Sequence, residues 1–518
     1  MLRYLLASAC AVLALRAAPL ASSPFATALA APPAPPSADA KDLAAGNRVL
    51  SVGSGYDALL LRIHLIRHAT TSIALQTFIW TNDECGRLMI YELIEAARRG
   101  VKVRILADHM FSDQDPDIGA FLATAHPNFE VRHYRPATSR LKPSLYHTLY
   151  SALRSFRDTN QRMHNKVMLV DDALLLTGGR NIENTYFDHS TSMNFRDRDL
   201  LVAGPAVQAA VASFEEYWGY RHAIPTRELR DVDAALKKDT FKRYPTRAYY
   251  DFGPHFDGLD REASDAALIA ERFVARLQLV RRATFVADEP GKIKRASSVA
   301  RITQTLRETL QRARTSIVMQ TPYLVLSRPA QDLLREMQAR NPGLQVHIST
   351  NSFASTDNLL AYSANYRLRS RYVEDLRLLI HEFKPHPASL HALFPRYPAM
   401  RALAEKAKIE RLPFLCLHAK SLVVDDATAF VGSYNLDPRS ETLNTEVGLL
   451  IEDERFAAAL RAEIERDMLP ENAWAIARRA LPLKLDVVNG WIDGILSVSP
   501  LDIWPIQNTS SYELRPGA

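Results

Sequence analysis

Short apolar runs alternate with helical patterns in two stretches of the chain, and the two stretches match each other. Residues 71–80 are rich in β-branched and aromatic residues, as a buried strand is, and residues 315–324 repeat their pattern. In both stretches, apolar residues at helical spacing follow, a glycine (Gly100 or Gly343) ends the helix, and another apolar run begins. The order strand–helix–strand predicts an α/β domain, and its return after about 250 residues predicts a duplicated domain rather than a solenoid.

The two copies also share their most distinctive polar residues at identical spacing. These residues are His164, Lys166, Asp171 and Asn181 in the first copy and His418, Lys420, Asp425 and Asn435 in the second. The residues between each histidine and aspartate are largely apolar, which predicts a buried strand. Side chains alternate between the two faces of a strand, so the histidine and the lysine, two residues apart, should share one face. The aspartate lies beyond that pattern, where a second aspartate follows and a turn is expected.

Histidine, lysine and asparagine together suit the chemistry of a phosphodiester. Histidine can attack or exchange a proton near neutral pH, lysine carries a positive charge, and asparagine offers amide donors. Two such sets around one anionic centre would clamp a phosphate electrostatically. One imidazole would attack phosphorus to give a covalent phosphohistidine, and the other would protonate the departing alkoxide and later activate the acceptor hydroxyl. Neither copy has cysteine or histidine at the spacing of a zinc site, so we expect no metal and no cofactor.

Composition narrows the class of protein without identifying a partner. The chain has 518 residues, of which 47% are hydrophobic and 24% charged, values typical of a globular protein and not of a disordered or fibrous one. Three cysteines are too few for a disulfide scaffold. The formal net charge of +6 favours an acidic partner, either lipid head groups or nucleic acid. Nucleic acid is the weaker expectation, because the basic residues are dispersed rather than gathered in dense patches with aromatic residues.

The N-terminal segment, residues 1–30, has the pattern of an export signal. Residues 1–3 carry a positive charge, residues 5–15 form an uncharged and mostly apolar run, and Ala28 to Ala30 offer a small-residue cleavage site. Such a run is too short to span a bilayer. We therefore predict an exported protein that is periplasmic or membrane-peripheral, with secretion as a further possibility. A short buried helix and a lipoprotein signal at Cys10 are the alternatives.

The repeated segments resemble those of a known enzyme superfamily. The two segments with histidine, lysine and aspartate resemble the paired HKD motifs of the phospholipase D superfamily. Residues 162–166, 178–182, 350–352 with Asp357, 436–440 and 443–446 further resemble the bacterial cardiolipin synthase branch, especially its C type. The resemblance implies two similar α/β domains, each a mixed β-sheet flanked by helices, related by a pseudo-twofold axis with the active site between them. It also implies phosphatidyl transfer through a phosphohistidine, with no metal.

The resemblance assigns a role to each motif residue. His164 and His418 form the imidazole pair, with His164 as the nucleophile and His418 as the acid and then the base. The phosphate oxygens would be held by Lys166, Lys420, Asn181, Asn435 and Ser433. Asp171 and Asp425 belong to the catalytic motifs, in a structural or orienting role rather than a chemical one. Glu446 and Asp197 stand where the superfamily often places an acid bonded to the opposite histidine, although Asp197 could equally be a solvated charge.

Two residues depart from the repeated or the family pattern. Gly179 stands where the second copy has Ser433, so the first copy lacks that hydroxyl group. Tyr362 stands where the cardiolipin synthase pattern has a histidine after Asp357. This second departure leaves the choice of acceptor open.

These features predict an organisation and a function for the whole chain. The expected segments are a signal peptide (1–30), a Pro/Ala-rich linker (31–42), a first phospholipase D-like domain (43–225), a connector (226–285), a second phospholipase D-like domain (286–480) and an apolar tail (481–518). The tail could lie on a membrane or pack on the second domain. We expect a monomeric, cardiolipin synthase-like phosphatidyltransferase that acts on phospholipid at a membrane surface. The alternatives are a hydrolytic phospholipase D that releases phosphatidic acid, an HKD nuclease, and a lipid-binding protein without turnover.

Overall fold

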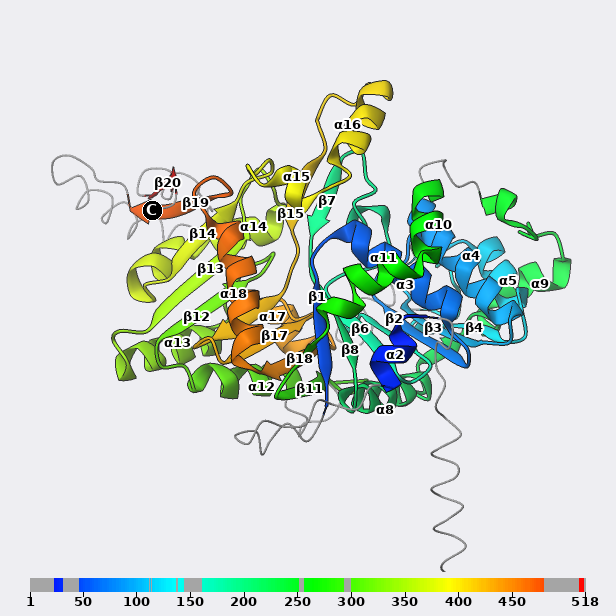
Figure 1. Cartoon of the computed structure of the whole chain (residues 1–518), viewed down its shortest axis with the longest axis horizontal. Coiled ribbons are helices and arrows are strands. Elements are labelled where there is room, and N and C mark those ends of the chain that lie inside the picture. Colours follow the sequence, from blue (N-terminus) through cyan, green and yellow to red (C-terminus); the bar gives the residue numbers. More distant parts are fainter. Residues whose placement is uncertain are drawn as a thin grey trace, which may run out of the picture.

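Two large β-sheets, one in each half of the chain, form the body of the protein (Figure 1). The computed structural model describes residues 23–30, 46–110, 112, 114–136, 138–143, 161–250, 256–292, 300–478 and 512–516. Within these residues each half contributes a nine-stranded sheet with helices packed against it. A separate two-stranded sheet, β7 (Met193–Arg196) with β15 (Phe414–Leu417), takes one strand from each half and so joins them.

The first sheet has a parallel centre and antiparallel flanks. Its strands, in spatial order, are β10 (Gln278–Leu279), β1 (Arg48–Val52), β8 (Asp199–Ala203), β6 (Leu174–Gly178), β5 (Val167–Val170), β2 (Ser72–Thr77), β3 (Lys102–Asp108), β4 (Phe129–Tyr134) and β9 (Ala223–Pro225). Strands β2, β3 and β4 are parallel to one another, and all other neighbours pair antiparallel. This is a mixed sheet, as the resemblance implies.

The second sheet repeats the topology of the first. Its strands, in spatial order, are β11 (Arg282–Ala287), β18 (Val447–Glu452), β17 (Thr428–Gly432), β16 (Ser421–Val424), β12 (Ser316–Gln320), β13 (Gln345–Asn351), β14 (Leu379–Phe383), β19 (Ala473–Arg478) and β20 (Tyr512–Pro516). Without the edge strands β10 and β20, the eight strands of each sheet follow the same order, with the same three parallel strands. The duplicated α/β fold is confirmed. Strand β11 begins inside the segment predicted as a connector.

Helices cover the sheets, and matched helices begin with matched caps. The helices are α2 (Phe25–Ala30), α3 (Gly55–His68), α4 (Glu84–Arg98), α5 (Pro116–Thr124), α8 (Ala206–Trp218), α9 (Arg230–Lys238), α10 (Asp257–Ser264), α11 (Ala266–Arg272), α12 (Arg301–Gln311), α13 (Arg328–Arg340), α14 (Leu359–Arg367), α15 (Leu390–Leu393), α16 (Tyr397–Lys406), α17 (Pro438–Thr442) and α18 (Glu454–Met468). The Asp83 side chain accepts a hydrogen bond from Gly86 N at the start of α4, and Ser327 accepts one from Ala330 N at the start of α13. Such caps satisfy N–H groups that lack partners within the helix.

One hydrophobic core runs through both halves and fixes their relative position. Every residue of β5 and β16 is buried, as expected for strands covered on both faces. A single cluster of buried side chains contains Leu169 and Phe214 of the first half together with Val423 and Phe456 of the second. Phe214 lies on α8, and Phe456 lies on α18. One face of each motif strand therefore packs into a cluster shared by both halves, and the other face packs into the separate core of its own half.

Part of the predicted signal peptide packs against the first half. Phe25, on α2, is fully buried, and Ser23 Oγ lies 2.7 Å from His64 Nε2 on α3. Cleavage after Ala30 would remove this packed segment. The rest of the predicted signal peptide and the predicted linker lie outside the described residues, as does the predicted tail apart from β20, which pairs with β19 on the second sheet.

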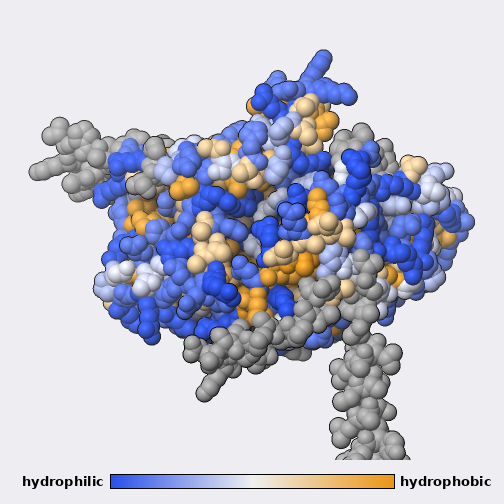
Figure 2. Space-filling view, viewed as in Figure 1, coloured by the Kyte–Doolittle hydropathy of each residue, from blue (hydrophilic) through white to orange (hydrophobic). Residues whose placement is uncertain are grey.

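The described surface is largely hydrophilic on the face shown in Figure 2, where apolar side chains form small separate patches. Such patches are ordinary on a folded protein, and only a concentration of large exposed apolar side chains requires an explanation. No helix in the described parts of the chain combines the length and the apolar character needed to cross a membrane.

Candidate active site

The two motif histidines lie at the junction of the halves, and each pairs through its backbone with the opposite half. His418, which directly follows β15, donates its N–H to Arg196 O on β7 at 2.8 Å. At the equivalent place in the other motif, His164 N donates to Thr445 O at 2.9 Å. In both cases the accepting residue directly precedes an acidic residue. The pairing therefore brings an acid from each half beside the histidine of the other half.

Each histidine ring contacts that acid. His164 Nδ1 lies 2.8 Å from Glu446 Oε2, and His418 Nδ1 lies 2.6 Å from Asp197 Oδ2. Both acids are fully buried, and the histidines are only 6% and 5% exposed. Asp197 is thus a buried partner of His418 and not a solvated charge. Because the acid engages Nδ1 of each ring, Nε2 is the nitrogen that can react with a substrate, and at His418 this atom also lies 3.0 Å from Lys420 Nζ.

The residue packed against each acid differs between the halves. A Cβ atom on Gly179 would lie 2.2 Å from Asp197 Oδ1, so only glycine fits there. In the second half a side chain does fit, and Ser433 Oγ donates to Glu446 Oε2 at 2.5 Å. The hydroxyl of Ser433, expected at the phosphate, is therefore directed at the acid. The departure seen at Gly179 in the sequence is explained by the close approach of Asp197.

The two motif lysines lie beside their histidines, but each His–Lys pair directly precedes β5 or β16, so the predicted position of these pairs on a strand is wrong. Lys166 Nζ donates to His164 O at 2.9 Å, and Lys420 Nζ lies 3.0 Å from His418 Nε2. Neither lysine is more than 3% exposed. The charges of both lysines act on His164, which places the two motifs around one centre. Two ammonium groups and two imidazoles thus surround a site suited to an anion.

The two histidine–acid pairs differ in charge at neutral pH. Burial raises the pKa of Glu446 to about 7. Burial acts in the same direction on Asp197, but Lys420 and His418 outweigh it and lower the pKa of this acid to about 2. Burial and two nearby lysines hold the pKa of His164 well below its usual range. Burial and Lys420 also lower the pKa of His418, with Asp197 opposing the shift. Asp197 is therefore ionised and can stabilise a positive His418, whereas His164 is a neutral imidazole.

The two motif asparagines differ in their hydrogen bonds. Asn181 Nδ2 donates to Tyr186 Oη at 2.8 Å, and the ring of Tyr186 stands edge-on to His418, with 5.2 Å between centroids. Asn435 is buried, and its Oδ1 has no hydrogen-bond partner within the described part of the chain. Asn181 is therefore held in place by protein contacts, while Asn435 retains hydrogen-bonding capacity for a ligand.

The motif aspartates lie at the opposite end of their strands from the histidines. Asp171 accepts three backbone N–H groups at the start of β2, and Asp425 accepts three at the start of β12. Both have left-handed backbones, with φ of 54° and 52°. Although burial opposes the shift, these hydrogen bonds lower the pKa of Asp425. The two aspartates therefore fasten the ends of neighbouring strands together, away from the reacting centre.

Replacing Asp171 with Asn is expected to lower stability more than turnover. The neutral amide loses charge-assisted acceptance of the three N–H groups, which should cost about 1.5–3 kcal/mol of the free energy of unfolding. The neighbouring Asp172 has the same left-handed backbone, with φ of 53°, and supplies the control Asp172→Asn. Urea unfolding, together with turnover per folded molecule, checks this expectation. A large loss of turnover at unchanged unfolding free energy would contradict it.

Two further polar residues hold the backbone just before each histidine. Asp108 Oδ2 accepts a hydrogen bond from Met163 N at 3.0 Å, and Asn351 Oδ1 accepts one from Leu417 N at 2.7 Å. Asp108 and Asn351 end β3 and β13, which are equivalent strands, and both are buried. Neither had a predicted role. Both are the last residue of equivalent strands, so an alignment of the repeated strands would have shown that Asp108 and Asn351 correspond.

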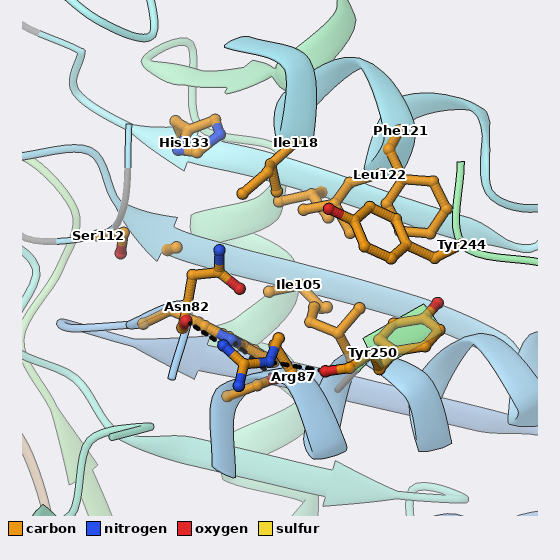
Figure 3. A pocket seen from close by; sticks show the side chains of 15 residues that line it. Asn82, Arg87, Ile105, Ser112, Ile118, Phe121, Leu122, His133, Tyr244 and Tyr250 are labelled. Carbon is orange, nitrogen blue, oxygen red and sulfur yellow. Dashed lines mark hydrogen bonds between the residues drawn. The ribbon is translucent and has the colours of Figure 1, made fainter. Parts of the chain in front are cut away.

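A separate apolar pocket lies between α4, α5 and β3 in the first half (Figure 3). Its volume is about 730 Å³, including space open to solvent, and Tyr244 and Tyr250 close one side. At its base Arg87 donates to the carbonyl oxygens of Tyr250 and Asn82. No motif histidine, lysine or asparagine lines this pocket, so it is distinct from the centre described above. Within the described residues no group of three or more His, Cys, Asp or Glu side chains could hold a metal ion.

Comparison with known proteins identifies the family of the chain. Residues 62–218 and 306–468 match the family described as "Cardiolipin synthase, PLD-like domain". Cardiolipin synthase C of Escherichia coli (strain K12) is 31% identical over 407 residues, which cover 77% of this chain and 80% of that protein. Major cardiolipin synthase ClsA of Bacillus subtilis (strain 168) is 26% identical over 427 residues, covering 82% of this chain and 69% of that protein.

A solved structure supports the fold. Phosphatidylserine synthase of Haemophilus influenzae Rd KW20 superimposes with a TM-score of 0.53 at 16% identity, and the match covers 82% of this chain and 87% of that one. At this identity the likeness concerns the fold alone. The sequence matches to both motif regions show that the chain belongs to the cardiolipin synthase, PLD-like domain family and is an enzyme of the phospholipase D superfamily.

Proposed function

We propose that this enzyme transfers a phosphatidyl group from one phospholipid to a hydroxyl group of a second lipid, in the manner of a cardiolipin synthase. The observation that carries the proposal is the pairing of His164 and His418 with buried acids from opposite halves, beside two buried lysines. Such a centre suits an anionic phosphodiester. The relatives named cardiolipin synthase support a phospholipid as the source of that phosphodiester.

In the first step His164 Nε2 attacks phosphorus. The N–P bond forms while the ester P–O bond breaks, and His418 gives its Nε2 proton to the departing oxygen. Glu446 holds His164 in the orientation that leaves the Nε2 lone pair free. The ionised Asp197 stabilises the protonated form of His418, and an anionic phosphate bound nearby would favour that form further.

In the second step the acceptor hydroxyl replaces the group that left. His418 Nε2 takes the hydroxyl proton, the acceptor oxygen forms a bond to phosphorus, and the N–P bond breaks to restore neutral His164. Lys166 and Lys420 hold the phosphate oxygens in both steps. Water as the acceptor would make the enzyme a hydrolytic phospholipase D. The burial of both histidines favours transfer, because it limits the access of water to the intermediate.

Export to a periplasmic or membrane-peripheral location is part of the proposal, as is a monomeric state. Export is supported by the positive charge at residues 1–3 and the short apolar run at residues 5–15. These residues lie outside the described ones, so the support comes from their composition alone.

Mass spectrometry of lipid products tests the proposed reaction. The full chain is incubated with phosphatidylglycerol vesicles, with and without a primary alcohol, beside His164→Ala and His418→Ala variants. We expect the parent enzyme to form cardiolipin and free glycerol, and we expect both variants to lose this activity. Phosphatidic acid without cardiolipin would instead assign a hydrolytic phospholipase D. Turnover of single-stranded DNA without lipid turnover would assign a nuclease.

The pH dependence of kcat/KM should reflect Lys420. Burial lowers the pKa of this lysine to about 8, although Asp197 opposes the shift. The ammonium group is positive below that pH and neutral above it, so kcat/KM is expected to fall as pH rises through about 8. In Lys420→Arg the guanidinium stays charged, and the fall should move to higher pH even if the maximum is lower. An unchanged profile in this variant would assign the fall to another group.

A further inference from the structure

Large exposed apolar side chains gather on two segments that touch each other. Phe353, Leu359 and Leu360 are 67%, 58% and 84% exposed, and Ile409 and Leu412 are also exposed. These five residues, named here the docking surface, are more than half of the nine large apolar residues exposed in the described parts of the chain. A concentration of this kind marks a surface that contacts an apolar partner.

A hydrogen bond joins the two segments of the docking surface. Arg411, between Ile409 and Leu412, donates from Nη2 to the carbonyl oxygen of Ala354, next to Phe353, at 2.8 Å. Leu359 and Leu360 form the first turn of α14, which Asn358 caps by accepting a hydrogen bond from Ala361 N. The apolar side chains are therefore presented by ordered backbone at neighbouring positions.

The charges around the docking surface are mainly positive. Helix α16 and the loop after it project from the body of the molecule (Figure 1). Residues 401–412 contain four basic residues and two acidic ones: Arg401, Lys406, Lys408 and Arg411 against Glu405 and Glu410. Arg401 and Glu405 pair with each other, which leaves the excess positive. Exposed apolar side chains with basic residues beside them suit a bilayer that contains anionic phospholipid.

The docking surface is connected directly to β15, the strand that directly precedes the second histidine. Asp357 lies between Phe353 and Leu359, and its carboxylate accepts hydrogen bonds from Tyr323 Oη at 2.6 Å and from Cys416 Sγ at 3.7 Å. Cys416 lies on β15, two residues before His418. The charge of Asp357 also acts on His418. A membrane bound at this surface would therefore lie close to the segment that positions His418.

We propose that the docking surface seats the protein on a bilayer containing anionic phospholipid. Phe353, Leu359 and Leu360 enter the region between head groups and acyl chains, Ile409 and Leu412 extend the same contact, and the basic residues nearby bind the negative head groups. The proposal rests on the proposed function for the choice of phospholipid as partner. A second copy of the chain is the competing occupant, and the test separates the two.

Vesicle co-sedimentation of the full chain tests this proposal. The variant Phe353→Ser/Leu359→Ser/Leu360→Ser is compared with Leu379→Ser/Leu469→Ser, which removes two large apolar side chains exposed elsewhere. With vesicles of phosphatidylglycerol and phosphatidylcholine, the docking variant should bind about 10-fold more weakly or worse, and the control variant should bind as the parent does. Binding of the parent should weaken in high salt and on vesicles of phosphatidylcholine alone.

Two further measurements keep this proposal separate from the proposed function. On a short-chain phosphatidylglycerol dissolved as monomers, the docking variant should turn over as fast as the parent, and it should be slower only on vesicles. Equal vesicle binding by variant and parent would overturn the docking surface while leaving the proposed function intact. If sedimentation shows that the parent is a dimer and the variant is not, while both bind vesicles equally, the surface would be assigned to contact with a second copy of the chain. If the variant loses vesicle binding but the parent turns over no lipid, the result would support the docking surface and reject the proposed function.

Discussion

Replacing His164 with Asn should lower turnover of phospholipid by on the order of 10⁴-fold or more, because the variant lacks the imidazole that forms the bond to phosphorus in the proposed mechanism. Burial and the two lysines hold the pKa of His164 well below its usual range, so its ring is neutral and has a lone pair for attack. Asparagine keeps a polar side chain of similar reach but has no lone pair comparable in nucleophilicity. The loss should appear in kcat, with little change in vesicle binding.

A matched variant separates this chemical loss from a loss of folding. His133 is buried to the same degree as His164, at 6% exposure each, but lies on β4 outside the motifs. His133→Asn should keep turnover per folded molecule within about 3-fold of the parent, while its unfolding free energy falls. Substantial turnover by His164→Asn would contradict the role assigned to His164. It would leave His418 as the nucleophile.

Replacing Gly179 with Ala should lower turnover by about 10²–10³-fold through an effect on His418. The new Cβ would lie 2.2 Å from Asp197 Oδ1, so the carboxylate has to move away from its bonded position. His418 then loses the partner 2.6 Å from Nδ1 that orients its ring and stabilises its protonated form. Protonation of the leaving oxygen should be the step that suffers.

The choice of leaving group tests this explanation. A phosphodiester that releases p-nitrophenol needs little protonation of the leaving oxygen, so the first-turnover burst of p-nitrophenol from Gly179→Ala should recover most of the parent rate, as that from His418→Asn should. The second step, which needs His418 as the base, should stay slow in both variants. The control is Gly258→Ala on α10, where an added Cβ meets no atom within 4 Å and turnover should not change. Parent-like phospholipid turnover by Gly179→Ala would show that the position of Asp197 does not matter. Equal losses on both substrates would indicate general misfolding instead.

The duplicated fold was predictable because strand, helix and motif patterns recur in order along the chain. The repeat predicted that the His–Lys pairs lie on buried strands, but the pairs lie just before β5 and β16, which carry the apolar segments that follow them. The order of strands within each sheet was not predictable in the same way, since pairing between β1 and β8 joins residues far apart in sequence. The packing of Phe25 into the first half also depends on such long-range contacts.

The reacting centre was predictable in its motif residues but not in the contacts that distinguish its two halves. The spacing within each motif predicts that histidine and lysine share a face, whatever the other half does. Asp197 and Glu446 reach their histidines only through backbone pairing across the junction. The need for glycine at position 179 arises from that same approach of Asp197 and has no local sequence signal.

Trapping of the covalent intermediate tests the central claim most directly. The enzyme is mixed with phosphatidylglycerol labelled in the phosphate, quenched within milliseconds at alkaline pH, where a phosphoramidate survives, and digested for peptide mapping. We predict label on the peptide that contains His164. This label should be absent in His164→Asn and retained in His418→Asn when an activated substrate is used. Label on the peptide that contains His418, or turnover with no labelled peptide under any quench, would contradict the account.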